Sequence, residues 1–291
     1  MKKKGLRIIL AIVLLVLVAV VVFGMIVNSV AKKAVEEGGT YALGVDTRVD
    51  TVSLSLVRGQ LDMDKLNVAN PEGYKTDHLI AANRFHMTVE TGSVFSDTVE
   101  IPTFQIDGLG LNIEQKSGKT NISEIIDNIA KLAGEEDADA EEGKLVRVGS
   151  FVVTDIVATV QVLPIGGEAT TLEVKVPRIE LKDISSADGK GVPVSELFGQ
   201  LLVPVLTAVL EKGQGILPTD LLNDLDKNVN GLVGTLGEDA ARLAEQAGES
   251  LKELEGAVEE VGKTIEGATE GLKDAGEGLK GALESLGGKK E

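Results

Sequence analysis

Residues 114–121, EQKSGKTN, come nearest in this sequence to a nucleotide-binding loop. Gly118-Lys119-Thr120 stands between a strand-like run and a helix-like run, as the end of a Walker A motif does. That motif, G-x-x-x-x-G-K-[ST], also requires a glycine at position 113, which is Ile113. Asn121 and Glu124 are spaced to cap the helix that follows, and a carboxylate there would repel phosphate. The pattern therefore predicts a structural turn into a capped helix.

Other residue types that could do chemistry form no complete set. His78 and His86 are eight positions apart, with no metal-binding spacing between them. Asp62 and Asp64 share one face of a predicted strand, about 7 Å apart, where they could hold a cation or simply face solvent. The chain has no cysteine, which excludes thiol catalysis and disulfides. No Gly-x-Ser-x-Gly motif or Ser-His-acid set is present either. We therefore predict a protein that is not an enzyme and uses no cofactor or metal.

The charge of the chain bears on its partners. Its formal net charge is −17, from 46 acidic and 29 basic residues. Nucleic acids require clustered Lys and Arg, so this balance argues against them as partners. Residues 135–142, EEDADAEE, carry six acids without the glycine turn and ligand spacing of a calcium loop. We expect residues 134–143 to form a solvated acidic loop.

An uncharged, apolar run extends from Ile8 to Val27. Twenty helical residues span about 30 Å, the thickness of the bilayer's hydrocarbon core. Four basic residues lie within residues 1–7, so the positive-inside rule places this stub in the cytoplasm and the bulk of the chain across the membrane. A cleaved signal peptide is the alternative, although its apolar region is usually about 7–15 residues. We predict a single transmembrane helix over residues 8–27. Its representative anchor residues are Ile8, Leu15, Val22 and Val27.

Beyond the anchor, residues 40–212 combine strand-like and helix-like patterns, which predicts an α+β domain. Residues 28–37 continue the first helix, and residues 76–82 could form a helical turn. A phase shift between Met63 and Leu66 suggests a bulge or bend. The expected strands are residues 49–57, 60–69, 84–90, 98–107, 109–115, 144–154, 156–163, 169–176 and 178–184.

The pattern of apolar residues predicts two helices within this domain. Ile122, Ile125, Ile126 and Ile129 form one apolar stripe. Residues 193–210 are apolar nearly all round, with a kink expected at Pro204. This second helix either packs as a core or lid helix or lines a lipid-accessible cavity.

Residues 213–237 are expected to be a linker, and residues 238–291 an acidic, Gly-rich, amphipathic helical tail. Apolar residues from Leu251 to Leu286 alternate steps of three and four, which is a heptad seam. The seam is interrupted by glycines, each of which destabilises an isolated helix by about 1 kcal/mol relative to alanine. We predict a marginal helix that either pairs with a protein partner or with itself through residues 240–286, or stays loose.

Three stretches together resemble the AsmA-like family of bacterial envelope proteins. They are VDTVSLSLVRGQLDMDKLNVANPEGY (49–74), VEIPTFQIDGLGLNIEQKSGKTNISEII (99–126) and VPRIELKDIS (176–185). Asn70-Pro71-Glu72-Gly73-Tyr74 fits the family's turn, and Gly118-Lys119-Thr120-Asn121-Ile122 fits its corner. The type 2 late embryogenesis abundant domain shares a strand pair ending in Asn-Pro, but the Gly-x-Thr-Asn corner favours AsmA. The resemblance covers about residues 1–210.

The resemblance implies a single-pass protein of the bacterial inner membrane with a periplasmic, curved, mainly antiparallel β-sheet groove and short capping helices. In that family an apolar groove guides lipid acyl chains in outer-membrane biogenesis. The groove candidates here are Leu54, Leu56, Leu61, Met63, Leu66, Val68, Phe104, Ile106, Leu111 and Ile113. The alternative is a structural or scaffold protein that recruits a partner through its heptad tail.

Overall fold

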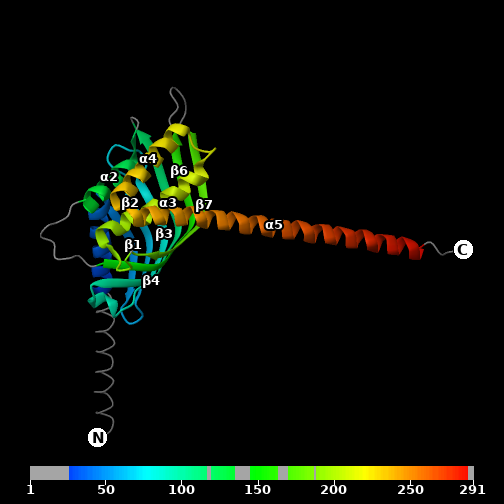
Figure 1. The fold of residues 1–291 in the computed structure, drawn as a ribbon, viewed down its shortest axis with the longest axis horizontal. Coiled ribbons are helices and arrows are strands. Elements are labelled where there is room, and N and C mark those ends of the chain that lie inside the picture. The colour runs from blue at the N-terminus through cyan, green and yellow to red at the C-terminus, as the bar shows by residue number, and fades with distance from the viewer. Residues whose placement is uncertain (1–25, 117–118, 135–144, 163–169, 187, 288–291) are drawn as a thin grey trace, which may run out of the picture. The chain divides into compact units, whose positions relative to one another are not determined.

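The computed structural model describes residues 26–116, 119–134, 145–162, 170–186 and 188–287. The chain forms two compact units, one ending at Gly248 and the other beginning at Glu249. The first unit holds a mixed α+β fold built on one curved, open sheet (Figure 1). The predicted α+β class and the curved, mainly antiparallel sheet are confirmed.

Six long strands form the sheet in the order β1-β2-β3-β4-β6-β7. Neighbouring strands are antiparallel except β4 and β6, which are parallel. Short strand β5 (Lys119–Thr120) pairs with β4, and β8 (Val192–Pro193) pairs with β6. The long strands are β1 (Thr47–Ser55), β2 (Gln60–Ala69), β3 (His78–Thr88), β4 (Thr98–Lys116), β6 (Leu145–Val162) and β7 (Thr170–Ile184).

All six long strands bend at the same level. Asp64 pairs with Arg84 and Leu66 pairs with Ala82, so Lys65 lies opposite Asn83. The same registers continue this row across the sheet. The row consists of Asp50, Lys65, Asn83, Gly108, Asp155 and Pro177. Three of its members have left-handed backbones, with φ of 53° at Lys65, 69° at Gly108 and 52° at Asp155.

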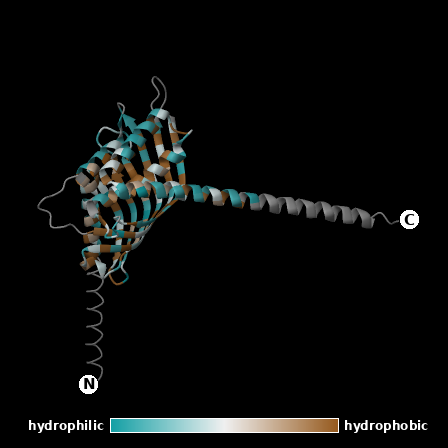
Figure 2. Ribbon diagram, viewed as in Figure 1, coloured by the Kyte–Doolittle hydropathy of each residue, from teal (hydrophilic) through white to brown (hydrophobic). Residues whose placement is uncertain are grey.

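At this bend row, the alternation of inward-facing and outward-facing side chains along each strand changes phase. Inward residues normally recur every second position, but Met63 and Leu66 both face the interior across the row, three positions apart. Ile106 and Leu109 repeat the same step in β4. The register does not shift between Met63 and Leu66, so the predicted irregularity there is a bend. Apolar and polar residues alternate along the strands (Figure 2), which gives the sheet one apolar face.

A second level of bending crosses β4, β6 and β7. The registers place Pro102 opposite Gly149 and Gly149 opposite Asp183. A Cβ atom on Gly149 would lie 2.9 Å from the Pro102 carbonyl oxygen, so the close approach of β4 and β6 here requires glycine. Asp183 is left-handed, with φ of 53°. The two bends curve the sheet around its apolar face.

The described part of the chain has five α-helices and a short 3-10 helix at Ser93–Phe95. A helix covers residues 26–43 at the start of the described chain. The others are α2 (Asn121–Gly134), α3 (Val194–Gly213), α4 (Thr219–Leu236) and α5 (Glu238–Gly287). Helix α3 contacts β7, α2 and α4, and it continues through Pro204. The apolar face of the sheet is thus partly covered by helices of the same chain.

Both edges of the sheet are protected by side chains from helices. Along β1, Asn28 Oδ1 accepts a hydrogen bond from the Leu54 amide (2.9 Å) and Lys32 Nζ donates to the Asp50 carbonyl (3.0 Å). Along β7, Arg242 donates to the carbonyls of Asp183 (3.2 Å) and Ser185 (2.9 Å). Because these groups occupy backbone atoms that a further strand would need, neither edge is open along its whole length.

Several sequence-based boundaries were wrong. The expected linker over residues 213–237 is mostly helix α4, which buries Leu221, Leu225, Val229, Leu232 and Leu236. These leucines and the valine recur at steps of three and four, which is helical spacing. The expected helical turn over residues 76–82 is instead the start of β3.

Several predicted strands were too short. The paired predictions at 98–107 and 109–115, 144–154 and 156–163, and 169–176 and 178–184 each merge into one strand. The bend row lies between the members of each pair and explains why they looked separate. The first unit also extends beyond residue 212, because Ala240, Leu243 and Ala247 of α5 are fully buried.

The predicted anchor falls almost wholly outside the described residues. Ile8, Leu15 and Val22 lie outside them, and Val27 belongs to the helix over residues 26–43. Across the described ranges, no helix is both long and apolar enough to cross a membrane. The expected acidic loop at 134–143 is likewise outside them except for Gly134.

Candidate functional site

An apolar cavity of about 560 Å³ lies between the inner face of the sheet and the helices of the first unit. Strands β1 to β4, the end of the helix over residues 26–43, α2 and α3 all contribute to its wall. Among the residues that the structure describes, none that lines it is charged, and Tyr41 and Thr47 are the lining residues with polar side chains. Its volume lies in the range of small-molecule sites, about 300–1,000 Å³. The cavity therefore suits an apolar ligand.

Seven of the ten predicted groove candidates line this cavity. They are Leu61, Met63, Leu66, Val68, Phe104, Ile106 and Leu111. The remaining three do not line it. Leu56 follows β1 and is 55% exposed, Leu54 is half-buried, and Ile113 is fully buried in β4. A binding role for the candidates stays a prediction. The placement of the seven lining candidates on one cavity wall is a property of the fold.

Most of the residues that line the cavity were not among the predicted groove candidates. The missed strand residues are Thr47 in β1, Ile80, Phe85 and Met87 in β3, Leu109 in β4 and Phe151 in β6. Phe85, Phe104 and Phe151 form a tilted aromatic row across three strands, with ring centroids 6.2 Å and 5.3 Å apart. Ile80 lies in residues 76–82, which were interpreted as a helical turn. Phe85 and Met87 lie in the predicted strand 84–90, but they were not chosen as groove candidates.

Helices supply the rest of the wall. Leu197, Leu201 and Val205 of α3 face the cavity, which agrees with the cavity-lining alternative for this helix. Ala34, Val35 and Ala42 from the helix over residues 26–43 also face it. Nothing in the sequence distinguished these small residues from an exposed helical extension.

The two motifs that carried the family resemblance meet at one buried polar cluster. Asn121 Nδ2 donates to Asn70 Oδ1 (2.9 Å) and to the Asn112 carbonyl (2.7 Å), and its Oδ1 accepts from the Glu114 amide (2.9 Å). Asn121 is completely buried. These bonds join the end of β2, the end of β4 and the start of α2 into one corner.

Glu114 is the charged centre of this corner and is only 6% exposed. Its carboxylate accepts hydrogen bonds from the amides of Lys75 (2.9 Å) and Thr76 (2.7 Å), from Asn70 Nδ2 (3.0 Å) and from the Thr76 hydroxyl. Burial opposes ionisation of this group, but the hydrogen bonds from Thr76, Lys75 and Asn70 outweigh it and hold its pKa below the usual value. The corner therefore depends on an ionised Glu114.

Thr120, in the Gly-Lys-Thr sequence of the same corner, also has a structural role. The Thr120 hydroxyl is fully buried, donates to Asp224 Oδ2 (3.0 Å) and lies 2.8 Å from Ser123 Oγ. Asn228 Nδ2 donates to Ser123 Oγ (2.8 Å), so α4 is fastened to the start of α2. Of the predicted Asn121–Glu124 capping pair, Asn121 Oδ1 accepts from the Ile122 amide at the start of α2 (3.0 Å), while the same side chain also bonds to β4 and Asn70. Glu124 accepts a hydrogen bond from the Tyr74 hydroxyl (3.4 Å).

The carboxylates on the outer face of the sheet are occupied by neighbours. Asp62 Oδ1 lies 2.7 Å from His86 Nδ1, and Asp64 accepts from the Thr51 hydroxyl (2.9 Å) and lies 3.7 Å from Arg84. The solvent-facing alternative for Asp62 and Asp64 therefore describes them better than a cation site. Among the described residues, no group of three or more metal-ligating side chains gathers.

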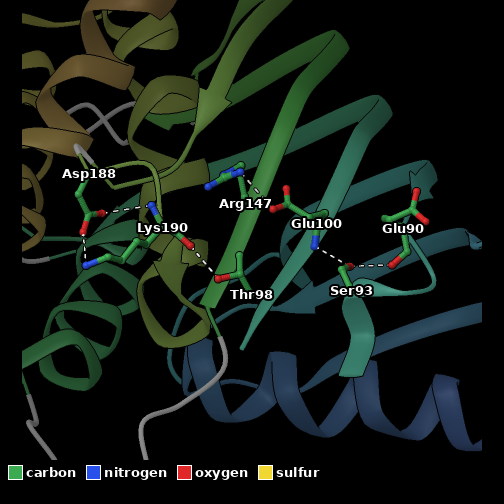
Figure 3. A network of polar contacts seen from close by, with 7 residues as sticks. All are labelled: Glu90, Ser93, Thr98, Glu100, Arg147, Asp188 and Lys190. Atoms are coloured by element: carbon green, nitrogen blue, oxygen red, sulfur yellow. Dashed lines mark hydrogen bonds and ion pairs between the residues drawn. The ribbon is translucent and has the colours of Figure 1, made fainter. Parts of the chain in front are cut away.

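A second polar network fastens the connection between β7 and α3 to the sheet (Figure 3). The Thr98 hydroxyl donates to the Lys190 carbonyl (2.9 Å), and Arg147 on β6 pairs with Glu100 on β4 at 3.1 Å. Hydrogen bonds from Lys190 and Ser186 hold the pKa of Asp188 below its usual range. Each of these groups has a partner in the fold: Thr98, Ser186, Asp188 and Lys190 bond to one another, and Arg147 pairs with Glu100.

Comparison with protein-family models finds no match to this chain, and comparison with curated proteins finds none.

Proposed function

We propose that this protein is a single-pass, membrane-anchored protein of the bacterial envelope whose groove holds lipid acyl chains during outer-membrane biogenesis. The observation that carries the proposal is the cavity of about 560 Å³, whose wall carries no charge in the described part of the chain. The AsmA-like resemblance of residues 1–210 supports the same function.

The chemistry of the wall selects the ligand class. A ligand that fills this cavity exchanges water for contacts with Leu, Val, Ile, Met and Phe side chains. Each methylene group removed from water contributes about 0.8 kcal/mol, so ten methylenes contribute about 8 kcal/mol before the entropy of binding is subtracted. A charged or strongly polar ligand would instead lose hydration without gaining partners. An acyl chain fits these requirements.

The anchor and the groove are close along the chain. Val27 ends the predicted transmembrane run, and Ala34 is the first residue that lines the cavity. Both lie on the same helix, and seven helical residues span only about 10 Å. An acyl chain leaving the outer leaflet of the inner membrane would therefore have a short path to the groove.

Lipid binding can be tested with a matched pair of variants on β2. Leu66 faces the cavity, whereas the side chain of its neighbour Asn67 points to the other face of the strand. Leu66→Asp places a charge in the groove, and Asn67→Asp places the same charge outside it. We expect purified wild type and Asn67→Asp to retain lipid in native mass spectrometry and Leu66→Asp to lose it. Equal lipid content in all three proteins, or none in any, would overturn the proposal.

The topology has its own test. The chain lacks cysteine, so a single cysteine at exposed Thr91 reports on that site alone. We expect a membrane-impermeant maleimide to label Thr91→Cys in intact spheroplasts and to miss Lys3→Cys. The reverse labelling pattern would contradict a periplasmic groove.

A second candidate function is a scaffold that recruits a partner through its tail. Its supporting observation is that Val258 and Val261, on the predicted heptad seam, are 66% and 57% exposed. Removal of residues 252–291 should then abolish recovery of a partner, or change the oligomeric mass, while lipid content stays constant. Unchanged partner recovery and unchanged mass would rule this candidate out.

A further inference from the structure

We propose that two apolar turns of the first unit, Leu56-Val57 and Val94-Phe95, insert into the lipid surface beside the predicted anchor. The inference rests on the proposed function, because it requires the anchor at residues 8–27 to enter a bilayer. It adds a second membrane contact, which would hold the sheet and its cavity in one orientation on the membrane.

Six exposed apolar side chains gather at one end of the first unit. They are Ile26, Val30, Leu56, Val57, Val94 and Phe95. Eleven large apolar side chains are exposed in the part of the chain that the structure describes, so more than half of them lie at this end. Val57 and Phe95 are the most exposed, at 97% and 92%. Single exposed apolar residues are ordinary on protein surfaces, whereas a cluster marks an interaction surface.

Hydrogen bonds place this end of the unit next to the predicted anchor. The helix over residues 26–43 lies antiparallel to β1, because its first turn bonds to Leu54, whereas the Thr40 hydroxyl accepts from the Thr47 amide (3.0 Å). The turn after β1 extends up to about 10 Å from Leu54 to Val57, since a strand rises about 3.3 Å per residue. The predicted transmembrane run ends in that first helical turn. The turn after β1 therefore lies at the level where the chain would enter the bilayer.

The connection between β3 and β4, residues 89–97, lies beside the turn after β1. The Val89 amide donates a hydrogen bond to the Gly59 carbonyl (2.7 Å). Because Thr88 pairs with Gln60, β3 ends where β2 begins. Both connections thus project from the same end of the sheet and can contact one lipid surface together. Thr91 lies beside buried Gly59, so shallow insertion of the apolar turns leaves Thr91 in water.

Hydrogen bonds hold the second apolar turn in an ordered conformation. The Ser93 hydroxyl donates to the Glu90 carbonyl (2.7 Å) and accepts from the Glu100 amide (2.8 Å) (Figure 3). Ser93 is buried, whereas Val94 and Phe95, which follow it in the same 3-10 helix, are exposed. A fixed backbone therefore presents these two apolar side chains to the surroundings.

The charges near the two turns do not select an anionic surface. Arg58 is exposed in the first turn, and Glu90 and Asp97 are exposed in the second connection. With one base against two acids, attraction to anionic headgroups does not contribute. Burial of apolar side chains is then the driving force, so a zwitterionic bilayer should be sufficient.

The test uses single cysteines, because the chain has none of its own. Full-length Val57→Cys, Phe95→Cys and Glu72→Cys each receive an environment-sensitive fluorophore and are reconstituted in phosphatidylcholine vesicles that contain lipids with doxyl-labelled acyl chains. Glu72 is exposed in the turn at the opposite end of β2, roughly 30 Å away for a ten-residue strand. We expect quenching of the labels at Val57 and Phe95 and none at Glu72.

A label at Leu15→Cys separates this inference from the anchor. Quenching at Leu15, with no more at Val57 and Phe95 than at Glu72, would overturn the contact of the apolar turns and leave the anchor intact. A lack of quenching at Leu15 would overturn the anchor itself, and with it the proposed function on which the inference rests.

A matched pair of charge variants tests whether the two turns insert together. Val57→Asp places a charge in the first turn and should remove most of the quenching of the label at Phe95. Ile216→Asp places the same charge at another exposed apolar residue, three positions before α4, whose Asp224 bonds to Thr120 at the other end of the sheet. It should leave the quenching unchanged. Equal quenching in the two variants would overturn the shared contact.

Discussion

Replacing Glu114 by glutamine should destabilise the first unit, and the effect should vanish in acid. The carboxylate accepts four hydrogen bonds while only 6% exposed. In Glu114→Gln, an NH₂ group replaces one of the two carboxylate oxygens. This group donates hydrogen bonds, so it would face one of the donors that the oxygen now accepts from. If that nitrogen takes the position of Oε2, the Lys75 amide loses its acceptor.

The magnitude follows from these contacts. One unsatisfied buried donor costs about 1–3 kcal/mol, and the remaining bonds lose the extra strength of a charged acceptor. We expect a loss of about 3 kcal/mol in the free energy of unfolding. For a unit of this size, 1 kcal/mol corresponds to about 2–4 °C, so the melting temperature should fall by about 6–12 °C.

The pH dependence has a definite sign. The pKa of Glu114 is lower in the folded protein than its usual value of 4.5, so its stabilisation is fully present above that value. The stabilisation is lost as pH falls through the lower, folded-state pKa. The difference in melting temperature between wild type and Glu114→Gln should therefore be full at pH 7 and shrink progressively below pH 4.5.

Thermal melting followed by circular dichroism at pH 7 and at pH 3.5 measures both effects. Exposed Glu72 lies in the nearby turn, so Glu72→Gln serves as the control and should melt like wild type. A difference of less than 1 °C between wild type and Glu114→Gln at pH 7, or the same large difference at both pH values, would refute this account of the corner.

Other predictions concern the bend row and the protected edge. Lys65→Gly should raise the free energy of unfolding by up to about 1 kcal/mol because it relieves a left-handed lysine. Gly108→Ala should instead lower it by about 2 kcal/mol or more, since a Cβ there would lie 2.2 Å from Asn83 Nδ2 at a φ of 69°. Urea midpoints that shift in opposite directions for the two variants would agree with both predictions. Equal shifts would contradict the left-handed backbone assigned to the bend row. Arg242→Ala exposes the carbonyls of Asp183 and Ser185, so light scattering should show faster aggregation on mild heating than for Lys252→Ala on the exposed part of α5.

The strands and the first helices could be predicted because their patterns are local. The stripe of Ile122, Ile125, Ile126 and Ile129 predicted α2, and three of its isoleucines are at most 1% exposed. Alternation along β2 and β4 identified seven residues of the cavity wall. These signals depend on spacing within one element, which a sequence displays directly.

The bends and the helical cover depend on contacts between distant residues. No local pattern shows that Lys65, Gly108 and Asp155 share one row, because strand register determines that alignment. The leucine stripe of α4 was not recognised, and residues 213–237 were expected to be a linker. Asp224 and Asn228 on α4 bond to Thr120 and Ser123, more than one hundred positions away, and only the fold brings them together.

The most direct test of the central claim is to map where a lipid chain contacts the protein. The full-length protein would be incubated with a fatty acid that carries a diazirine on its chain, irradiated and digested, and the adducts located by mass spectrometry. A groove that holds acyl chains predicts adducts on cavity-facing side chains such as Leu66 of β2, Ile106 of β4 and Leu201 of α3. Adducts confined to outer-face residues such as Asp62, Arg84 and Asp107, or no adducts within the first unit, would contradict it.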